Sequence, residues 1–171
     1  MTGVYVVGAI STYFGKRPQD SIKALTREAY LDVLRDAGAF DSAEIETCWF
    51  GNCGMWLDKQ GSIRGQVALT TLVREGLFPE RVPVTNVEGG CATASMAFNG
   101  ACKDIMSGTA QVSLAMGVEK TYFPDSPDKT SLLYCGGIDQ YDPQEWEEYY
   151  RSAGVEAGKL FEPAPDRTIF M

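Results

Sequence analysis

The stretch VTNVEGGCATASMAFNGAC, residues 84–102, constrains the fold of this chain more than any other. A strand-like run leads to Gly89 and Gly90, then to Cys91, and then to a helical segment built almost entirely from small side chains. In a close-packed interior, small side chains on several faces of a helix let neighbouring backbones approach it. The segment therefore predicts a central, buried helix with a cysteine at its start.

Strand-like and helix-like segments alternate along most of the sequence. The first predicted helix starts after Asp20 or Ser21 and stops at Gly38, because Ser and Asp cap helices and glycine ends them. Strands joined by helical crossovers form layered sheets, so the pattern predicts an α/β fold. Residues 111–119 are apolar on one face and small on the other, which predicts a central strand covered on both faces. The other predicted strands span 4–10, 47–51 and 82–88, and the other predicted helices span 64–76 and 91–108.

The pattern changes near Lys120. Residues 1–120 carry 11 basic and 13 acidic side chains, whereas residues 121–171 carry 4 and 10. The second part is rich in proline and aromatic residues, and only residues 143–152 predict a helix there, with Pro143 in its first turn. We expect a layered half-domain over 1–120 and an acidic loop region over 121–171, of the kind that forms lids or interaction surfaces.

Composition excludes several classes of partner. A net charge of −8 argues against nucleic acid, which needs a basic face to neutralise its phosphates. No apolar stretch approaches the ~20 residues of a membrane helix, so no membrane partner is expected. The five cysteines are too scattered for a disulfide framework, which predicts a reducing, cytoplasmic location.

Cys91 is the predicted catalytic residue. The first turn of a helix carries unpaired N–H groups and the positive end of the helix dipole, and both favour a thiolate over a thiol. Gly89 and Gly90 allow a sharp turn and leave room for a substrate carbonyl beside the sulfur. From these residues alone Cys91 is a candidate nucleophile, and a small buried core cysteine is the alternative.

Residues 82–120, VPVTNVEGGCATASMAFNGACKDIMSGTAQVSLAMGVEK, resemble the nucleophilic-cysteine segment of thiolases. Residues 8–38 and 61–83 are similar to the first loop and the first two helices of the sterol-carrier-protein-type branch, whose members read GVEK where this chain has residues 117–120. The resemblance covers 1–120 well and 121–171 loosely, as the start of the thiolase loop domain. It implies the first βαβαβ-type half of a layered thiolase fold, with a mixed sheet and a buried nucleophile helix.

The resemblance also implies an activity, that of an acetyl-CoA C-acyltransferase-like thiolase of lipid metabolism. Its substrates would be acyl-CoA and coenzyme A, with no bound cofactor. Cys91 would attack a 3-ketoacyl-CoA, release a shortened enolate and hold the acyl group as a thioester until coenzyme A removes it; the reverse reaction is a Claisen condensation. A thiolate suits both steps because it is a good nucleophile and a good leaving group.

The chain departs from the thiolase pattern because it contains no histidine. Thiolases place a histidine, an Asn- or His-bearing motif and a second cysteine in the C-terminal half of their fold. The YCGG at 134–137 echoes the second-cysteine motif but lies in the loop region, so that role is not assigned to Cys135. We therefore expect a thiolase N-terminal half that is inactive and prone to aggregate alone. Its expected partners are a C-terminal half or complementary chain, a second copy in a dimer and, by analogy, a small OB-fold, zinc-ribbon protein.

Several other cysteine, aromatic, methionine and basic residues could either serve a function or simply stabilise the fold. Cys48 and Cys53 lack the spacing of a zinc site, so no metal is predicted. Cys102 is expected to pack on the buried helix. Three residues either line an acyl pocket or pack in the core: Trp49, Met55 and Trp56. Two basic residues, Lys16 and Arg17, are expected to be solvated rather than bound to coenzyme A phosphates.

Two further functional classes stay open. A ketoacyl-synthase-type condensing enzyme shares the fold and the cysteine at the helix start, but the GVEK sequence and the first-loop similarity argue against it. A non-catalytic thiolase-like subunit would bind acyl-CoA or a partner protein, and the missing histidine favours it.

Overall fold

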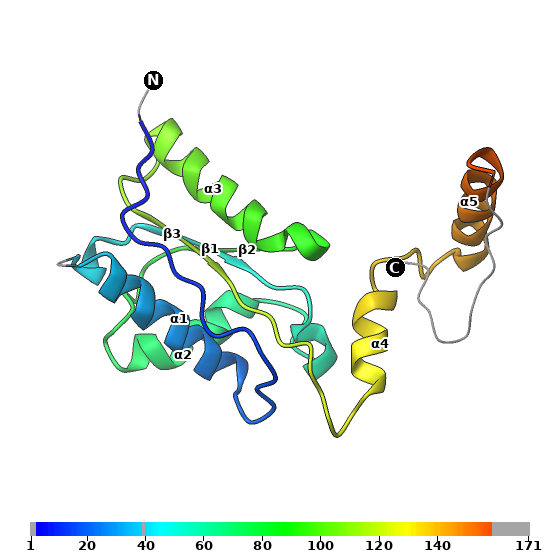
Figure 1. The fold of residues 1–171 in the computed structure, drawn as a ribbon. Helices are drawn as coiled ribbons and strands as arrows, with labels where there is room; N and C mark the ends of the chain where they lie inside the picture. The colour runs from blue at the N-terminus through cyan, green and yellow to red at the C-terminus, as the bar shows by residue number, and fades with distance from the viewer. Residues whose placement is uncertain (1–2, 39, 159–171) are drawn as a thin grey trace. The chain divides into compact units, whose positions relative to one another are not determined.

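A computed structural model of the chain describes residues 3–38 and 40–158 (Figure 1). These residues form two compact units that divide after Lys120, and each is described by itself. The first unit contains a small sheet with helices on both of its faces, an α/β arrangement as the sequence predicts. Its main elements are α1 (Ile22–Asp36), β1 (Thr47–Gly51), α2 (Arg64–Arg74), β2 (Val84–Val87), α3 (Thr93–Ser107) and β3 (Ser113–Gly117).

The described sheet has three strands in the order β2-β1-β3. Both pairings are parallel, with Cys48 opposite Val84 on one side and Leu114 on the other, so the mixed sheet that was expected is all parallel in the described residues. β1 is therefore the central strand. Both faces of β3 are covered, as predicted for 111–119, because Met116 packs in the core and Gly117 lies against α3. Among the described residues, however, β3 pairs with β1 alone and is an edge strand rather than a central one.

Residues 4–10, predicted to be a strand, are extended but belong to no sheet in the described structure. The segment runs beside the end of α1, where the Ala9 N–H donates to the Asp36 carboxylate at 2.8 Å. A Cβ on Gly8 would lie 2.9 Å from the Val33 carbonyl oxygen, so glycine permits this close approach. An isolated extended run becomes a strand only when a neighbouring strand takes up its backbone hydrogen bonds, and none does so here.

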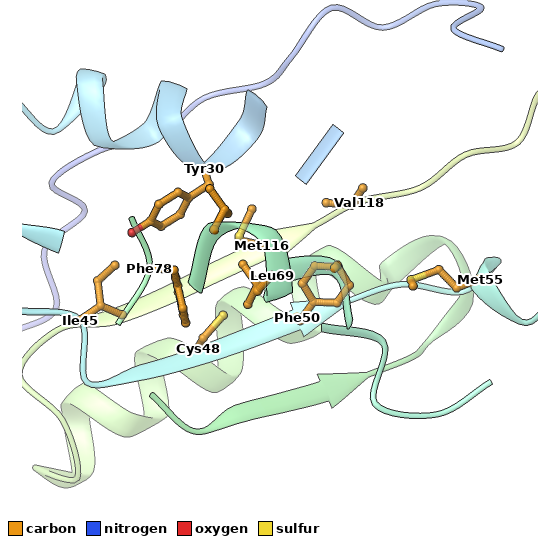
Figure 2. Close-up of a cluster of buried hydrophobic side chains, with 11 residues drawn as sticks. Tyr30, Ile45, Cys48, Phe50, Met55, Leu69, Phe78, Met116 and Val118 are labelled. Carbon is orange, nitrogen blue, oxygen red and sulfur yellow. The ribbon is translucent and has the colours of Figure 1, made fainter. Parts of the chain in front are cut away.

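Helices α1 and α2 cover one face of the sheet and enclose the main hydrophobic core (Figures 1 and 2). The Ser21 hydroxyl caps α1 by accepting the Ala24 N–H at 3.1 Å, which confirms the predicted start. Tyr30 from α1 is fully buried, donates its hydroxyl to the Leu77 carbonyl at 2.7 Å and meets the Phe78 ring edge-on. The core also contains Cys48, Phe50, Met55, Leu69, Leu72 and Met116.

Helix α3 covers the opposite face of the sheet and lies close to it because small residues meet there (Figure 1). A Cβ on Gly100 would lie 2.4 Å from the Trp49 ring, and one on Gly117 would lie 2.6 Å from the Ala94 Cβ. The residues of α3 that are buried are Thr93, Ala97, Gly100 and Ala101. In the described chain, the other side of α3 is exposed and apolar at Met96, Phe98 and Met106, so the helix expected to be buried all round is covered on one side.

The second unit contains α4 (Asp128–Cys135) and α5 (Pro143–Glu156). The predicted helix at 143–152 is confirmed and continues to Glu156; the Asp142 carboxylate caps it by accepting the Glu145 N–H at 3.0 Å. The α4 helix was not predicted. None of the second unit's described residues is buried, and the contact between the Trp146 and Tyr150 rings lies within α5. Among the described residues of the whole chain, no helix is both long and apolar enough to cross a bilayer.

Candidate active site at the carboxyl edge of the sheet

The carboxyl ends of three parallel strands bring the candidate site residues to one edge of the sheet. β1 ends at Gly51 and leads to Asn52 and Cys53; β2 ends at Val87 and leads to Glu88 and the glycines before Cys91. β3 ends at Gly117 and leads to Glu119. In parallel α/β sheets this edge is where ligands bind.

Cys91 is exposed and lies in a single 3-10 turn, Gly90–Ala92, directly before α3. The α-helix itself begins at Thr93, two residues later than the sequence predicts. Before α3 the Ala92 N–H donates to the Gly89 carbonyl at 3.0 Å in the 3-10 pattern, and Gly90 turns the chain with a φ of +57°. Cys91 is thus presented on a tight turn at the amino end of the helix and is exposed among the described residues.

The two glycines before Cys91 have separate roles. Gly90 supplies the left-handed conformation, which residues with a Cβ adopt at a cost. A Cβ on Gly89 would lie 2.1 Å from the Met96 sulfur, so a larger residue there would require the exposed Met96 side chain to move. The sequence-based expectation of a sharp turn next to the cysteine is therefore confirmed.

Side chains from three elements hold the backbone of this turn. The Glu88 carboxylate accepts the Gly90 N–H at 2.7 Å. The Thr93 hydroxyl accepts the Gly89 N–H at 2.9 Å and donates to the Gly90 carbonyl at 2.7 Å. Cys53 from the end of β1 places its sulfur 3.2 Å from a Glu88 oxygen, 3.3 Å from the Gly90 carbonyl oxygen and 3.2 Å from the Thr93 hydroxyl.

Glu119 and Asn52 hold the neighbouring loop that carries Cys53. The Glu119 carboxylate accepts the backbone N–H groups of Cys53 at 2.7 Å and Gly54 at 3.0 Å. The Asn52 side chain is buried; its amide nitrogen donates to the Val118 carbonyl at 2.7 Å and its oxygen accepts the Met55 N–H at 2.9 Å. These contacts fix the loop after β1 to the end of β3, so the position of Cys53 is set by two strands.

The GVEK sequence gains a structural explanation from the same contacts. Val118 is buried in the core and Glu119 binds the loop after β1. The Lys120 ammonium donates to the carbonyls of Pro18 and Asp20, each at 2.8 Å, and so holds the loop before α1. These residues join three loops at one edge of the sheet.

The thiols of β1 and of the loop that follows it, Cys48 and Cys53, differ in their electrostatic surroundings. Burial raises the pKa of the Cys48 thiol to about 12. The pKa of Cys53 is raised, first by burial and then by the Glu88 carboxylate, against a lowering contribution from Thr93. Both thiols therefore stay protonated near neutral pH, which leaves Cys53 a hydrogen-bond donor rather than a nucleophile.

The carboxylates of the site shift in opposite directions. The pKa of Glu88 is lowered, first by the Gly90 N–H and then by the Cys53 thiol. The pKa of Glu119 is raised, first by desolvation, with the backbone N–H groups of Cys53 and Gly54 opposing the rise. Glu119 as a residue is exposed, so the desolvated part is the carboxylate that the loop surrounds.

The other sequence candidates lie away from Cys91 or serve the fold. Trp49 packs under α3 and donates its indole N–H to Asp104 at 2.7 Å, and Met55 belongs to the core, while Trp56 is exposed. Arg17 pairs with Asp20 and Glu28. Cys102 lies on α3 and Cys135 ends α4. Among the described residues, no group of three His, Cys, Asp or Glu side chains is placed to hold a metal ion.

Sequence reasoning missed Glu88, Thr93, Asn52 and Glu119 as site residues. Their signal was positional, because Glu88 and Glu119 are the last residues of predicted strands and Asn52 directly follows one. Parallel strands place such residues together, but the strand order that makes them neighbours is not visible in the sequence.

Comparison with known proteins identifies the family. Residues 4–130 match the model of the thiolase N-terminal domain. The chain is 31% identical to the acetyl-CoA acetyltransferase of Methanocaldococcus jannaschii over 150 residues, which covers 88% of this chain and 35% of that protein. It is 32% identical to the acetyl-CoA acetyltransferase of Methanothermobacter thermautotrophicus over 149 residues, 86% of this chain and 35% of that protein.

A third relative is the benzoylsuccinyl-CoA thiolase subunit BbsB of Thauera aromatica, 29% identical over 116 residues, 68% of this chain and 28% of that protein. The chain thus spans about a third of the length of the curated relatives it matches. With a family match over residues 4–130 and a fold of the expected α/β kind, this chain belongs to the thiolase family and corresponds to its N-terminal half.

Proposed function

We propose that the chain provides the nucleophile of a thiolase-type acyltransferase and that Cys91 is that nucleophile. The observation that carries the proposal is the position of Cys91: an exposed thiol on a glycine turn where the carboxyl ends of the strands meet, in a chain of the thiolase family. Two archaeal relatives are named acetyl-CoA acetyltransferases, which makes short acyl-CoA thioesters the first substrates to test.

The proposed reaction has two stages. The Cys91 thiolate adds to the keto carbonyl of a 3-ketoacyl-CoA; the bond between the α and β carbons then breaks, and its electron pair leaves as the enolate of a shortened acyl-CoA, which takes up a proton. The acyl group stays on Cys91 as a thioester. The thiolate of a second coenzyme A attacks this thioester and releases Cys91 as the thiolate.

The proton-transfer groups of this reaction belong, in the proposal, to a C-terminal half or to a partner subunit. The chain contains no histidine, so an imidazole base has to come from elsewhere. The apolar exposed side of α3, with Met96, Phe98 and Met106, is the surface on which we place the complementary half. The second unit is proposed as the start of the substrate loop domain. Dimer formation, a zinc-ribbon partner and a cytoplasmic location stay predictions.

A single-residue exchange tests the function. In the complete protein that contains this chain, Cys91→Ala is expected to lower thiolysis of acetoacetyl-CoA by at least ~10³-fold. Cys102→Ala is the matched control, because Cys102 lies on the same helix and is not at the turn; it should stay within about 2-fold of wild type. Full turnover by Cys91→Ala would refute the proposal.

A non-catalytic role is the second candidate, and the absence of histidine favours it. A thiolase-like subunit of this kind would bind acyl-CoA or a partner protein without forming a thioester. Binding of acetoacetyl-CoA to the complete protein, with no acyl group on Cys91 and no turnover, is the result that would establish it.

A further inference from the structure

The turn that carries Cys91 is held by side chains rather than by a regular helix. The Thr93 hydroxyl accepts the Gly89 N–H and donates to the Gly90 carbonyl. The Glu88 carboxylate accepts the Gly90 N–H. Gly90 has a φ of +57°, and it is the residue directly before Cys91. Glycine populates several backbone regions at similar energy, so this conformation has to be selected by its surroundings.

Glu88 occupies a distinct place in this arrangement. One oxygen, Oε1, accepts both the Gly90 N–H at 2.7 Å and the Cys53 thiol at 3.2 Å. The two donors come from the turn after β2 and from the loop after β1, so the carboxylate joins the cysteine turn to the central strand. Cys53 is itself fixed, because Glu119 binds its backbone N–H at 2.7 Å.

We propose that Glu88 is a positioning residue, which holds Gly90 in its left-handed conformation and thereby sets the direction of the Cys91 thiol. Cys53, in the loop after β1, is the fixed residue to which Glu88 is bound. Loss of the hydrogen bond from the Gly90 N–H to Glu88 lets the turn sample other conformations, so the Cys91 sulfur no longer points toward the substrate carbonyl. Misplacing a reacting group by ~1 Å costs up to ~100-fold in rate. The inference rests on the proposed nucleophilic role of Cys91, and it assigns Glu88 no proton transfer.

The test compares two variants of Glu88 in the complete protein. Glu88→Ala removes the acceptor, and we expect kcat to fall ~10- to 100-fold with KM within about 2-fold, since the group acts on the reacting thiol and not on substrate binding. Glu88→Gln keeps an oxygen that accepts from Gly90 and should recover kcat to within ~5-fold. Glu80→Ala is the matched control, because Glu80 is exposed and lies outside the turn; it should behave as wild type.

A second measurement separates positioning from a general loss of structure. The rate of Cys91 alkylation by iodoacetamide is followed by mass spectrometry, with the melting temperature recorded in parallel. We expect the rate for Cys91 to change ~10-fold in Glu88→Ala and to return in Glu88→Gln. Cys53→Ala, which removes the fixed point, should change it in the same direction by less. A change in melting temperature with wild-type kcat and alkylation rate would overturn the proposal.

The outcomes also distinguish this inference from the proposed function. Equal losses of kcat in Glu88→Gln and Glu88→Ala would show that the charge is required, which overturns positioning in favour of acid–base chemistry. Wild-type behaviour of Glu88→Ala, in a protein that Cys91→Ala inactivates, overturns positioning alone. Full turnover by Cys91→Ala overturns the proposed function, while the alkylation rates still report whether Glu88 holds the turn.

Discussion

The face of the sheet under α1 and α2 is filled by large side chains, whereas the face under α3 carries mostly small residues beside Trp49. On the first face Phe50, Leu69 and Tyr30 are essentially inaccessible to solvent (Figure 2). On the second, Gly51, Gly100 and Gly117 allow the backbones of helix and sheet to approach closely. Burial of large apolar side chains stabilises the fold, whereas small residues contribute less buried area but let the helix lie close to the sheet. The comparison indicates that one face stabilises the half-domain and the other brings the start of α3 against the carboxyl edge of the sheet.

The largest expected effect comes from a substitution in the core under α1 and α2. Phe50→Ala leaves a cavity between β1 and α2 and should lower the free energy of unfolding by ~3–5 kcal/mol. The measurement is urea denaturation of the complete protein. Phe14→Ala is the matched control, since Phe14 is fully exposed in this chain, and it should stay within ~0.5 kcal/mol. Equal effects of the two variants would contradict the assignment of the core.

A smaller effect tests the close approach of α3. Alanine normally stabilises a helix interior by ~1 kcal/mol relative to glycine. Gly100→Ala should do the opposite and destabilise by ~1–3 kcal/mol, because its Cβ would lie 2.4 Å from the Trp49 ring. Asn99→Ala, at the adjacent exposed position, supplies the control by denaturation under the same conditions. A more stable Gly100→Ala variant would show that α3 does not lie close to the sheet.

These two faces also show what the sequence was able to predict. The bounds of α1, β1 and α2 follow from local signals, such as the Ser21 cap and the glycine after each helix. The closeness of α3 to the sheet was expected from its small residues, and Ala97 is fully buried as that expectation requires. Local composition does not say on how many sides a helix is covered, which is why the outer side of α3 was misjudged.

The errors concern partners that are distant in the sequence. Residues 4–10 read as a strand because they are apolar and β-branched, but a strand requires a neighbour. The order β2-β1-β3 places Cys53, Glu88 and Thr93 together although 40 residues separate the first from the last. Cys91 itself was found from its glycines, but the residue pattern did not reveal that a 3-10 turn over Gly90–Ala92 precedes α3.

The smallest expected effect concerns pH at the turn. The pKa of Glu88 is lowered by the Gly90 N–H and the Cys53 thiol, so the folded state holds its proton less tightly than the unfolded state. Its contribution to stability is therefore present above the unfolded pKa and lost as pH falls through the lower, folded pKa. Because Glu88 is exposed, the difference in melting temperature between wild type and Glu88→Gln should be at most ~2 °C at pH 7.

That difference is expected to persist on acidification to pH ~5 and to vanish only below the usual range of glutamate. Melting curves of both proteins between pH 7 and the acid limit of stability provide the measurement. A difference that disappears well above that range would contradict the hydrogen bond from Gly90 to Glu88.

The central claim, that Cys91 carries the acyl group, is tested most directly by trapping the acyl-enzyme. The complete protein is mixed with acetoacetyl-CoA in the absence of coenzyme A, quenched with acid, digested and analysed by mass spectrometry. We expect an acetyl group on the peptide that contains Cys91, its loss on addition of coenzyme A, and none on the peptide that contains Cys53. An acetyl group on another residue, or turnover with Cys91 unmodified throughout, would contradict it.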